Sequence, residues 1–172
     1  SPHAHALIKS IDTSKAEVLP GVQAVMTAAD FPDHPFAYVG AARVQINFWH
    51  VTRNIMAREK ALYEGHAVAA VAAISPAVAA AACKLIEVDY EVLPHAIDVE
   101  AAAAEGAPLL FEDMITRDAD PVPTKPSNIA KEIRFEIGDV GQGFADADEV
   151  VEKEFRTAAV HQGYIEPHAT LA

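Results

Sequence analysis

The stretch from His66 to Leu93 constrains the fold of this chain more than any other. An apolar run, Ala67 to Ile74, leads into Ser75-Pro76, where a capping hydroxyl precedes a proline at the first helical position. Residues 87–93 then alternate between acidic and apolar side chains, with the two-residue period of a strand. This order of signals predicts strand, helix and strand, with the helix packed against a sheet.

Side-chain spacing defines the faces of these elements. The predicted helix carries its apolar face at Val78, Ala82, Leu85 and Ile86. The following strand points three apolar side chains to one side and three carboxylates to the other, which are Val88, Tyr90 and Val92 against Glu87, Asp89 and Glu91. Upstream, residues 62–64 and 66–74 are predicted strands around Gly65, and downstream Asp98 caps a helix to about residue 104.

The first sixty residues predict shorter elements. Residues 3–8 are the end of a strand, Asp12 caps a short helix through Glu17, and Pro20-Gly21 ends that helix. Residues 22–26 form a strand, and a helical turn at 27–30 stops at Phe31-Pro32. Residues 33–58 mix proline, glycine, aromatic and arginine residues without a clean period, so we interpret them as a long loop.

The last third of the chain reads as a linker followed by new elements. Residues 106–128 hold four prolines, which is typical of a connection between domains. A strand at 129–137, a capped helical turn at 139–147 and a strand at 149–160 follow. A closing strand at 168–172 would need partners from outside this sequence.

Composition excludes several classes of function. The formal net charge of −12 argues against nucleic acid and anionic membrane surfaces as partners, since both attract lysine and arginine patches. The single cysteine, Cys83, excludes an internal disulfide and an iron–sulfur cluster held by this chain's own cysteines, and it fits a reducing, cytoplasmic compartment. The longest apolar run is far shorter than the roughly 20 residues of a membrane-spanning helix.

Six segments in fixed order carry a resemblance to a known family. They are SPHAHALIKSID (1–12), LPGVQAVMTAADFP (19–32), LYEGHAVAAVAA (62–73), IEVDYEVLP (86–94), GDVGQGFADADEVVEKEFRT (138–157) and HQGYIEPHA (161–169). Together they resemble the large, molybdopterin-binding subunit of xanthine dehydrogenase/aldehyde oxidase-type molybdenum hydroxylases. The first four are similar to its a/b hammerhead domain, and the last two to the start of its molybdopterin-binding region.

The resemblance implies an α+β fold, a hammerhead-like mixed sheet with helices on one face, followed by the first strands of a second α/β domain. The implied domains are a hammerhead domain over 1–105, lacking its first strand, a linker over 106–128, and a truncated molybdopterin-binding part over 129–172. Both ends of the chain resemble internal segments of the family, so we interpret it as a piece of a longer enzyme.

The whole enzyme is expected to hydroxylate aldehydes, N-heterocycles or other aromatics with water, and the redox chemistry belongs to a molybdopterin-molybdenum cofactor. The resemblance implies [2Fe-2S] clusters and FAD on other domains or subunits. Expected partners are the remainder of the large subunit, iron–sulfur and flavin subunits in an oligomer, and a small-molecule substrate. The segment itself is expected to be structural and inactive. The alternative is a stand-alone, non-catalytic α+β binding or interaction module.

No catalytic, cofactor-binding or metal-ligating residue is assigned, although several candidates exist. His3 and His5 would share one strand face, but no third metal ligand lies nearby in sequence. A metal hydrolase using His3, His5, His161 and His168 is therefore a weak third hypothesis. The glycines of 138–143 lack the Lys-Ser/Thr of a phosphate loop and the third glycine of a dinucleotide motif, so a capped turn at Asp139 is favoured.

The remaining candidates favour structural roles. The carboxylates of Glu87, Asp89 and Glu91 are expected in water, and Cys83 is expected to be a buried structural thiol. Residues 161–168 are the most chemically dense stretch, yet Glu166 and His168 are expected to be structural. Phe48-Trp49-His50, within the predicted loop, could face a partner subunit, because aromatic side chains anchor interfaces.

Overall fold

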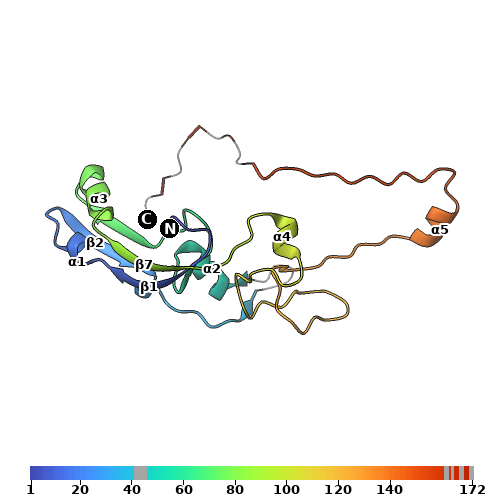
Figure 1. The fold of residues 1–172 in the computed structure, drawn as a ribbon, viewed down its shortest axis with the longest axis horizontal. Coiled ribbons are helices and arrows are strands. Elements are labelled where there is room, and N and C mark those ends of the chain that lie inside the picture. The colour runs from blue at the N-terminus through green and yellow to red at the C-terminus, as the bar shows by residue number, and fades with distance from the viewer. Residues whose placement is uncertain (41–45, 161–162, 164, 167–168, 171–172) are drawn as a thin grey trace. The chain divides into compact units, whose positions relative to one another are not determined.

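The structure, a computed structural model, describes all residues except 41–45, 161–162, 164, 167–168 and 171–172 (Figure 1). Its chain forms two compact units, residues 1–133 and residues 134–172. The two units are described separately. No helix in the described part of the chain is both long and apolar enough to cross a membrane.

The first unit is built around β1 (Ala6–Asp12), the middle strand of a three-stranded antiparallel sheet in the order β5-β1-β7. β7 (Glu87–Val92) pairs with β1 along its whole length, and β5 (Lys60–Ala61) pairs with its first two residues. The strand therefore continues to Asp12, beyond the predicted end at residue 8, because its ladder with β7 continues to the Asp12–Glu87 pair.

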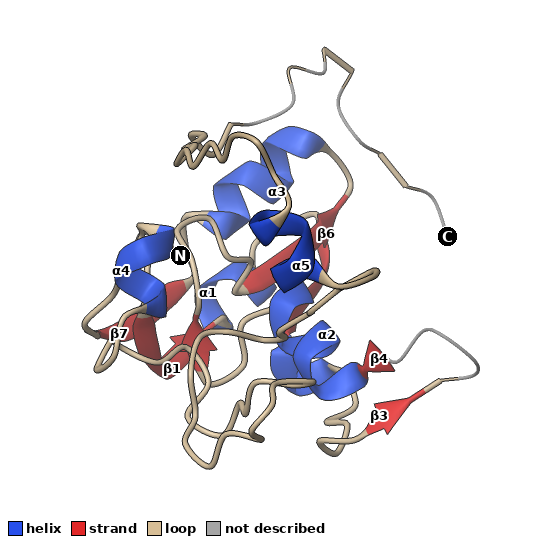
Figure 2. Ribbon diagram, turned by 90° about the vertical axis from the view of Figure 1, so that its right-hand side faces the viewer, coloured by secondary structure: helices blue, strands red, loops and turns tan. Residues whose placement is uncertain are grey.

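A second antiparallel sheet joins β2 (Val22–Thr27) to β6 (Ala69–Ala73), and α3 (Pro76–Cys83) packs on it (Figure 2). The helix begins as predicted, with the Ser75 hydroxyl accepting from the Val78 amide at 3.3 Å and Pro76 at the first helical position. Its predicted apolar face is confirmed for Ala82, which is buried, and Val78, which is half-buried, whereas Leu85 and Ile86 lie beyond the end of the helix at Cys83.

Short helices follow their predicted caps. The Asp12 carboxylate accepts from the Ser14 amide ahead of α1 (Ser14–Glu17), and Asp98 accepts two amides at the start of α4 (Val99–Ala103). A 3₁₀ turn, Ala28–Asp30, has a reciprocal capping box between Thr27 and Asp30. These predictions are confirmed because each depends on residues within one turn.

The predicted loop at 33–58 is wrong. It contains α2 (Phe48–Ile55) and a short hairpin of β3 (Tyr38–Val39) with β4 (Ile46–Asn47). The predicted strand at 62–64 is also wrong, since the strand lies two residues earlier, in β5, and a turn leads to His66.

Residues 106–128 belong to the first unit, and Asn128 ties the end of this stretch to its start and to α4. Its side-chain amide donates to the Ala102 and Pro108 carbonyls at 2.9 and 3.0 Å, and its side-chain oxygen accepts from the Leu110 amide at 3.1 Å. The boundaries of the domains, and a linking role for this stretch, stay predictions.

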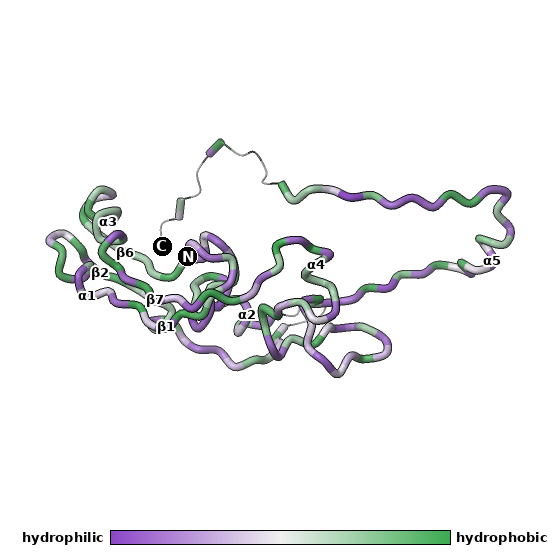
Figure 3. Tube along the Cα trace, viewed as in Figure 1, coloured by the Kyte–Doolittle hydropathy of each residue, from purple (hydrophilic) through white to green (hydrophobic). Residues whose placement is uncertain are grey.

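The second unit contains α5 (Val140–Ala145), begun by the Asp139 side chain as predicted. The predicted strands at 129–137 and 149–160, which would have opened a second α/β domain, are wrong, since the structure gives neither stretch a ladder. Both are extended, and every described residue from 131 onward is exposed. Hydrophobic and hydrophilic residues alternate along them (Figure 3). Alternation makes a strand only where a neighbouring strand accepts its hydrogen bonds.

The buried hydrophobic residues of the described chain are mostly small. They are Ala6, Ala16, Ala28, Met56, Ala57, Ala61, Leu62, Val68 and Ala82, and the largest fully buried side chain is that of His66. Backbone therefore approaches backbone closely in the first unit. The α+β class is confirmed, with antiparallel ladders between all described strands rather than one mixed sheet.

Gly21 tests this close packing. It has a φ of +94°, and an added Cβ would lie 2.9 Å from Ile74 Cδ1, whereas Gly65, with a φ of +85°, faces open space. We expect Gly65→Ala to lower the free energy of unfolding by about 1 kcal/mol through its backbone conformation alone. Gly21→Ala should cost up to about 1 kcal/mol more, because the end of the exposed Ile74 side chain must move. Urea denaturation measures both values, and equal losses would contradict the close approach at Gly21.

Candidate functional site

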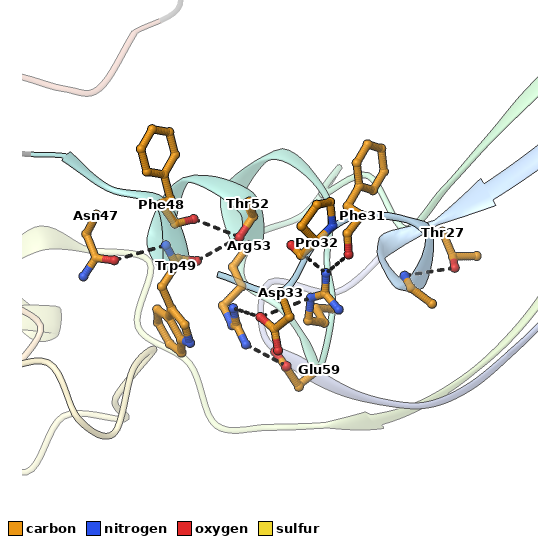
Figure 4. A network of polar contacts seen from close by, with 12 residues as sticks. Thr27, Phe31, Pro32, Asp33, Asn47, Phe48, Trp49, Thr52, Arg53 and Glu59 are labelled. Atoms are coloured by element: carbon orange, nitrogen blue, oxygen red, sulfur yellow. Dashed lines mark hydrogen bonds and ion pairs between the residues drawn. The ribbon is translucent and has the colours of Figure 1, made fainter. Parts of the chain in front are cut away.

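The most elaborate polar network in the described chain centres on Arg53, on the inner face of α2 (Figure 4). Its Nη1 donates to Asp33 at 3.1 Å and its Nη2 donates to Glu59 at 2.9 Å. The Arg53 side chain is only 9% exposed, whereas both carboxylates are more than half exposed. The network therefore holds a buried cation between two hydrated anions and ties α2 to the chain on either side of it.

Trp49 joins the same arginine to a cluster of aromatic rings. The Arg53 guanidinium carbon lies 4.0 Å above the Trp49 ring centre, a cation–π contact. Trp49 also makes edge contacts with Phe36 and Phe111, at 5.5 and 5.4 Å between ring centres, and His50 lies 4.8 Å from Phe111. We call Phe36, Trp49, His50 and Phe111 the aromatic cluster. Burial lowers the pKa of His50, while the nearby Asp113 carboxylate opposes that effect.

A pocket of about 260 Å³ opens beside this cluster, between α2, β5 and residues 111–113. The Lys60 ammonium donates to the Leu110 carbonyl and to Glu112, both at 2.7 Å. The hydrogen bond from Lys60 to Glu112 lowers the pKa of the Glu112 carboxyl. Arg53 and Glu59 pair with each other at the same pocket. Four of the charged groups that line this pocket, Arg53, Glu59, Lys60 and Glu112, are therefore paired with each other.

The structure separates the two histidines of the HXH pair. His5 is buried, and its Nδ1 lies 2.8 Å from the Pro94 carbonyl, whereas His3 packs edge-on against Tyr90. Among the described residues, no group of three or more His, Cys, Asp and Glu side chains has the arrangement of a metal site. His161 and His168, the other members of the hypothetical metal hydrolase, lie outside the described residues.

His66 is a buried polar residue that sequence reasoning missed. Its Nδ1 accepts the Leu62 amide at 3.1 Å, Tyr63 stacks on the ring at 4.4 Å, and its Nε2 is buried without a hydrogen-bond partner among the described residues. Burial lowers its pKa, against the raising effect of the Arg53 and Asn54 carbonyls. The only signal in the sequence for a buried histidine here was a Gly-His pair before an apolar run.

The carboxylate row on β7 is exposed to water, as predicted, and it pairs with lysines. Glu91 pairs with Lys9 of β1, and Glu87 pairs with Lys15 of α1. These contacts raise the pKa of each lysine. Exposed ion pairs of this kind add little stability, so the row is a hydrated face of the sheet.

The other candidates are distributed as follows. Cys83 is exposed, so the prediction of a buried thiol is wrong. It lies at the last position of α3, off the face that packs on the sheet. Residues 138–143 form the predicted capped turn, with the Asp139 carboxylate accepting from the Gln142 amide at 2.8 Å. Glu166 is exposed, and five members of the 161–168 stretch lie outside the described residues.

Two family models match this chain. The model for the aldehyde oxidase and xanthine dehydrogenase a/b hammerhead domain matches residues 1–94. The model for the molybdopterin cofactor-binding domain matches residues 122–172. Together they cover the six segments on which the resemblance rested.

Individual relatives agree with the family models. Probable hypoxanthine oxidase XdhD of Escherichia coli (strain K12) is 35% identical over 98% of this chain, and the carbon monoxide dehydrogenase large chain of Afipia carboxidovorans is 40% identical over 96%. The match spans 20% of either relative, so this chain has about a fifth of their length. The solved structure of reconstituted CO dehydrogenase from Oligotropha carboxidovorans is 40% identical, with a TM-score of 0.61, over 87% of this chain and 18% of that one.

The Arg53 network yields a stability prediction. We expect Arg53→Lys to lower the free energy of unfolding by about 1–2 kcal/mol, because an ammonium cannot reach Asp33 and Glu59 together or stack as a planar group on Trp49. Denaturation followed by the fluorescence of Trp49, the sole tryptophan, reports on this unit. Arg134→Lys is the control, since that side chain is exposed. Equal free energies of unfolding for the two variants would show that the Arg53 network does not stabilise this unit.

His66 yields a prediction about pH. Because its pKa is lowered in the folded chain, the unfolded chain binds more protons as the pH falls below about 6.5. The contribution of neutral His66 to the free energy of unfolding is therefore complete above pH 6.5. It is lost as the pH falls toward the pKa of His66 in the folded chain. The free energy of unfolding should decline less for His66→Gln than for the wild type between pH 7 and pH 5. Parallel declines would mean that His66 is accessible to protons in the folded state.

Proposed function

The chain belongs to the aldehyde oxidase and xanthine dehydrogenase family, and we propose that it is a structural segment of the molybdenum-cofactor subunit of an oxidoreductase. That enzyme would hydroxylate aldehydes, N-heterocycles or other aromatic compounds with oxygen from water. Other domains or subunits would carry [2Fe-2S] clusters and FAD, within an oligomer. A cytoplasmic location is part of the same proposal and rests on the single cysteine.

The exposure of large apolar side chains in the second unit is the observation that carries this proposal. Phe135 and Phe155 are 84% and 85% exposed, in extended stretches whose backbone has no ladder partner among the described residues. Such stretches combine unburied apolar surface with unpaired backbone groups, and folded proteins cover both. The polypeptide that would cover them belongs, in this proposal, to the rest of the molybdopterin-binding domain.

We propose that the described residues of this chain hold no molybdenum cofactor on their own. The molybdopterin model matches residues 122–172, and every described residue from 134 onward is exposed, which supports a site completed by other polypeptide. We therefore assign no catalytic step to these residues. In this proposal the segment supplies scaffold, and the cofactor's ligands come from other parts of the enzyme.

The outer face of α2 is the surface that we assign to contact with a partner subunit or with the rest of the large subunit. Phe48, Val51 and Ile55 are exposed and spaced three and four residues apart, so they form one apolar stripe. Trp49 points inward to Arg53. The interface expected at Phe48-Trp49-His50 would therefore use Phe48 and its helical neighbours rather than Trp49.

Mass and metal content of the natural protein test the proposal. We expect intact mass spectrometry to find a polypeptide roughly five times the length of this segment, as the coverage of its relatives indicates. The same preparation should contain molybdenum and copurify with iron. A 172-residue segment produced alone should show no hydroxylation of aldehydes or heterocycles, because it lacks a cofactor cradle.

The opposite result is equally clear. A natural polypeptide near 18.3 kDa, free of molybdenum and iron, would contradict the enzyme and support the non-catalytic binding module. Molybdenum could dissociate from the enzyme during purification. The control is to measure molybdenum in the crude extract before and after this polypeptide is depleted.

A further inference from the structure

A second pocket, of about 400 Å³, lies against α2 of the first unit. Four separate stretches meet there: β3, the end of β4 with α2, residues 111–117, and Ala130. The residues used below are Tyr38, Asn47, Phe111, Met114 and Arg117. Its volume lies within the usual range of small-molecule sites.

The charge of this pocket is opposite to that of the chain. Arg117 is the one charged residue among the described residues that line it, and none of these is a carboxylate, although the chain as a whole carries −12. The half-buried Arg117 guanidinium lies 4.5 Å above the Tyr38 ring and makes no ion pair among the described residues. The adjacent Asp118 carboxylate pairs with Lys131 instead, at 2.8 Å. The planar donors of Arg117 therefore have no hydrogen-bond acceptor among the described residues and can serve a ligand.

Asn47 adds a donor without an acceptor. Its side-chain oxygen is held by the Trp49 amide at 3.1 Å, which fixes the orientation of the amide group at the start of α2. Its Nδ2 is buried without a hydrogen-bond partner among the described residues, and the residue is only 6% exposed. Buried donors in folded proteins normally have an acceptor, and Asn47 is among the residues that line this pocket.

We propose that this pocket binds a small organic anion, a carboxylate on a flat apolar body. The planar guanidinium of Arg117 matches the two oxygens of a carboxylate, and the Asn47 amide supplies a further donor. Tyr38, Phe111 and Met114 form the apolar wall against which the body packs. This inference does not depend on the proposed enzymatic function, because it rests on one pocket of the first unit.

Calorimetric titration of the natural polypeptide that carries these residues tests the proposal, with benzoate as the probe. We expect saturable benzoate binding that weakens about tenfold or more in Arg117→Gln, since a charge-assisted, bidentate contact is lost. Arg134→Gln removes the same charge from an exposed site and should leave affinity unchanged. Benzoate bound elsewhere on the polypeptide would be insensitive to Arg117, so the difference between variants isolates this pocket.

Two further measurements keep the test decisive. Asn47→Asp retains the oxygen that caps α2 but replaces the buried donor with a negative charge, so it should also weaken benzoate binding. Benzylamine, with a similar ring and the opposite charge, should not compete with benzoate. The proposal is overturned if the wild type fails to bind benzoate. It is also overturned if folded Arg117→Gln and Asn47→Asp proteins, checked by circular dichroism, bind it as the wild type does, or if benzylamine competes equally.

Discussion

The antiparallel ladder between β1 and β7 is the interaction on which the rest of the first unit depends. It joins residues 6–12 to residues 87–92, and β5 pairs with the other side of β1. The intervening chain, which includes the second sheet, α2 and α3, is thereby enclosed between two paired strands. Buried side chains around this ladder are mainly alanines. Since an alanine methyl contributes little hydrophobic stabilisation, close backbone packing and strand pairing carry more of the fold than large side chains do.

Interactions within one helical turn made much of the first unit predictable from sequence. The elements that were predicted wrongly depend on residues far away in the sequence. Ser75, Asp98 and the Thr27–Asp30 pair act within one turn, so sequence alone locates their helices. The sequence did not predict α2, because the inner face of this helix carries Arg53, which counts as polar in a search for apolar periodicity. Asn47 as a cap and the spacing of Phe48, Val51 and Ile55 were the available signals. Conversely, alternation at 129–137 and 149–160 predicted strands that have no ladder in the described chain, because pairing depends on residues elsewhere.

The candidate sites follow the same division. The histidine pair was given no metal assignment, and nothing in the sequence indicated that His5 and His66 would be buried while Cys83 would be exposed. The aromatic cluster and the Arg117 pocket both combine α2 with residues 111–117, some sixty positions away. Only the folded chain brings those segments together. The helix that sequence reasoning interpreted as loop is therefore the element that organises both pockets of interest.

Amide hydrogen exchange, read peptide by peptide, tests most directly the claim that this chain joins a self-contained scaffold to a segment completed by other polypeptide. It should be measured on the 172-residue chain and on the natural protein. We predict slow exchange across β1 and β7 in both samples. For residues 149–160, we predict fast exchange in the isolated chain and slow exchange in the natural protein, where a neighbouring strand would pair with them. Slow exchange of 149–160 in the isolated chain, or fast exchange of β1, would contradict the account.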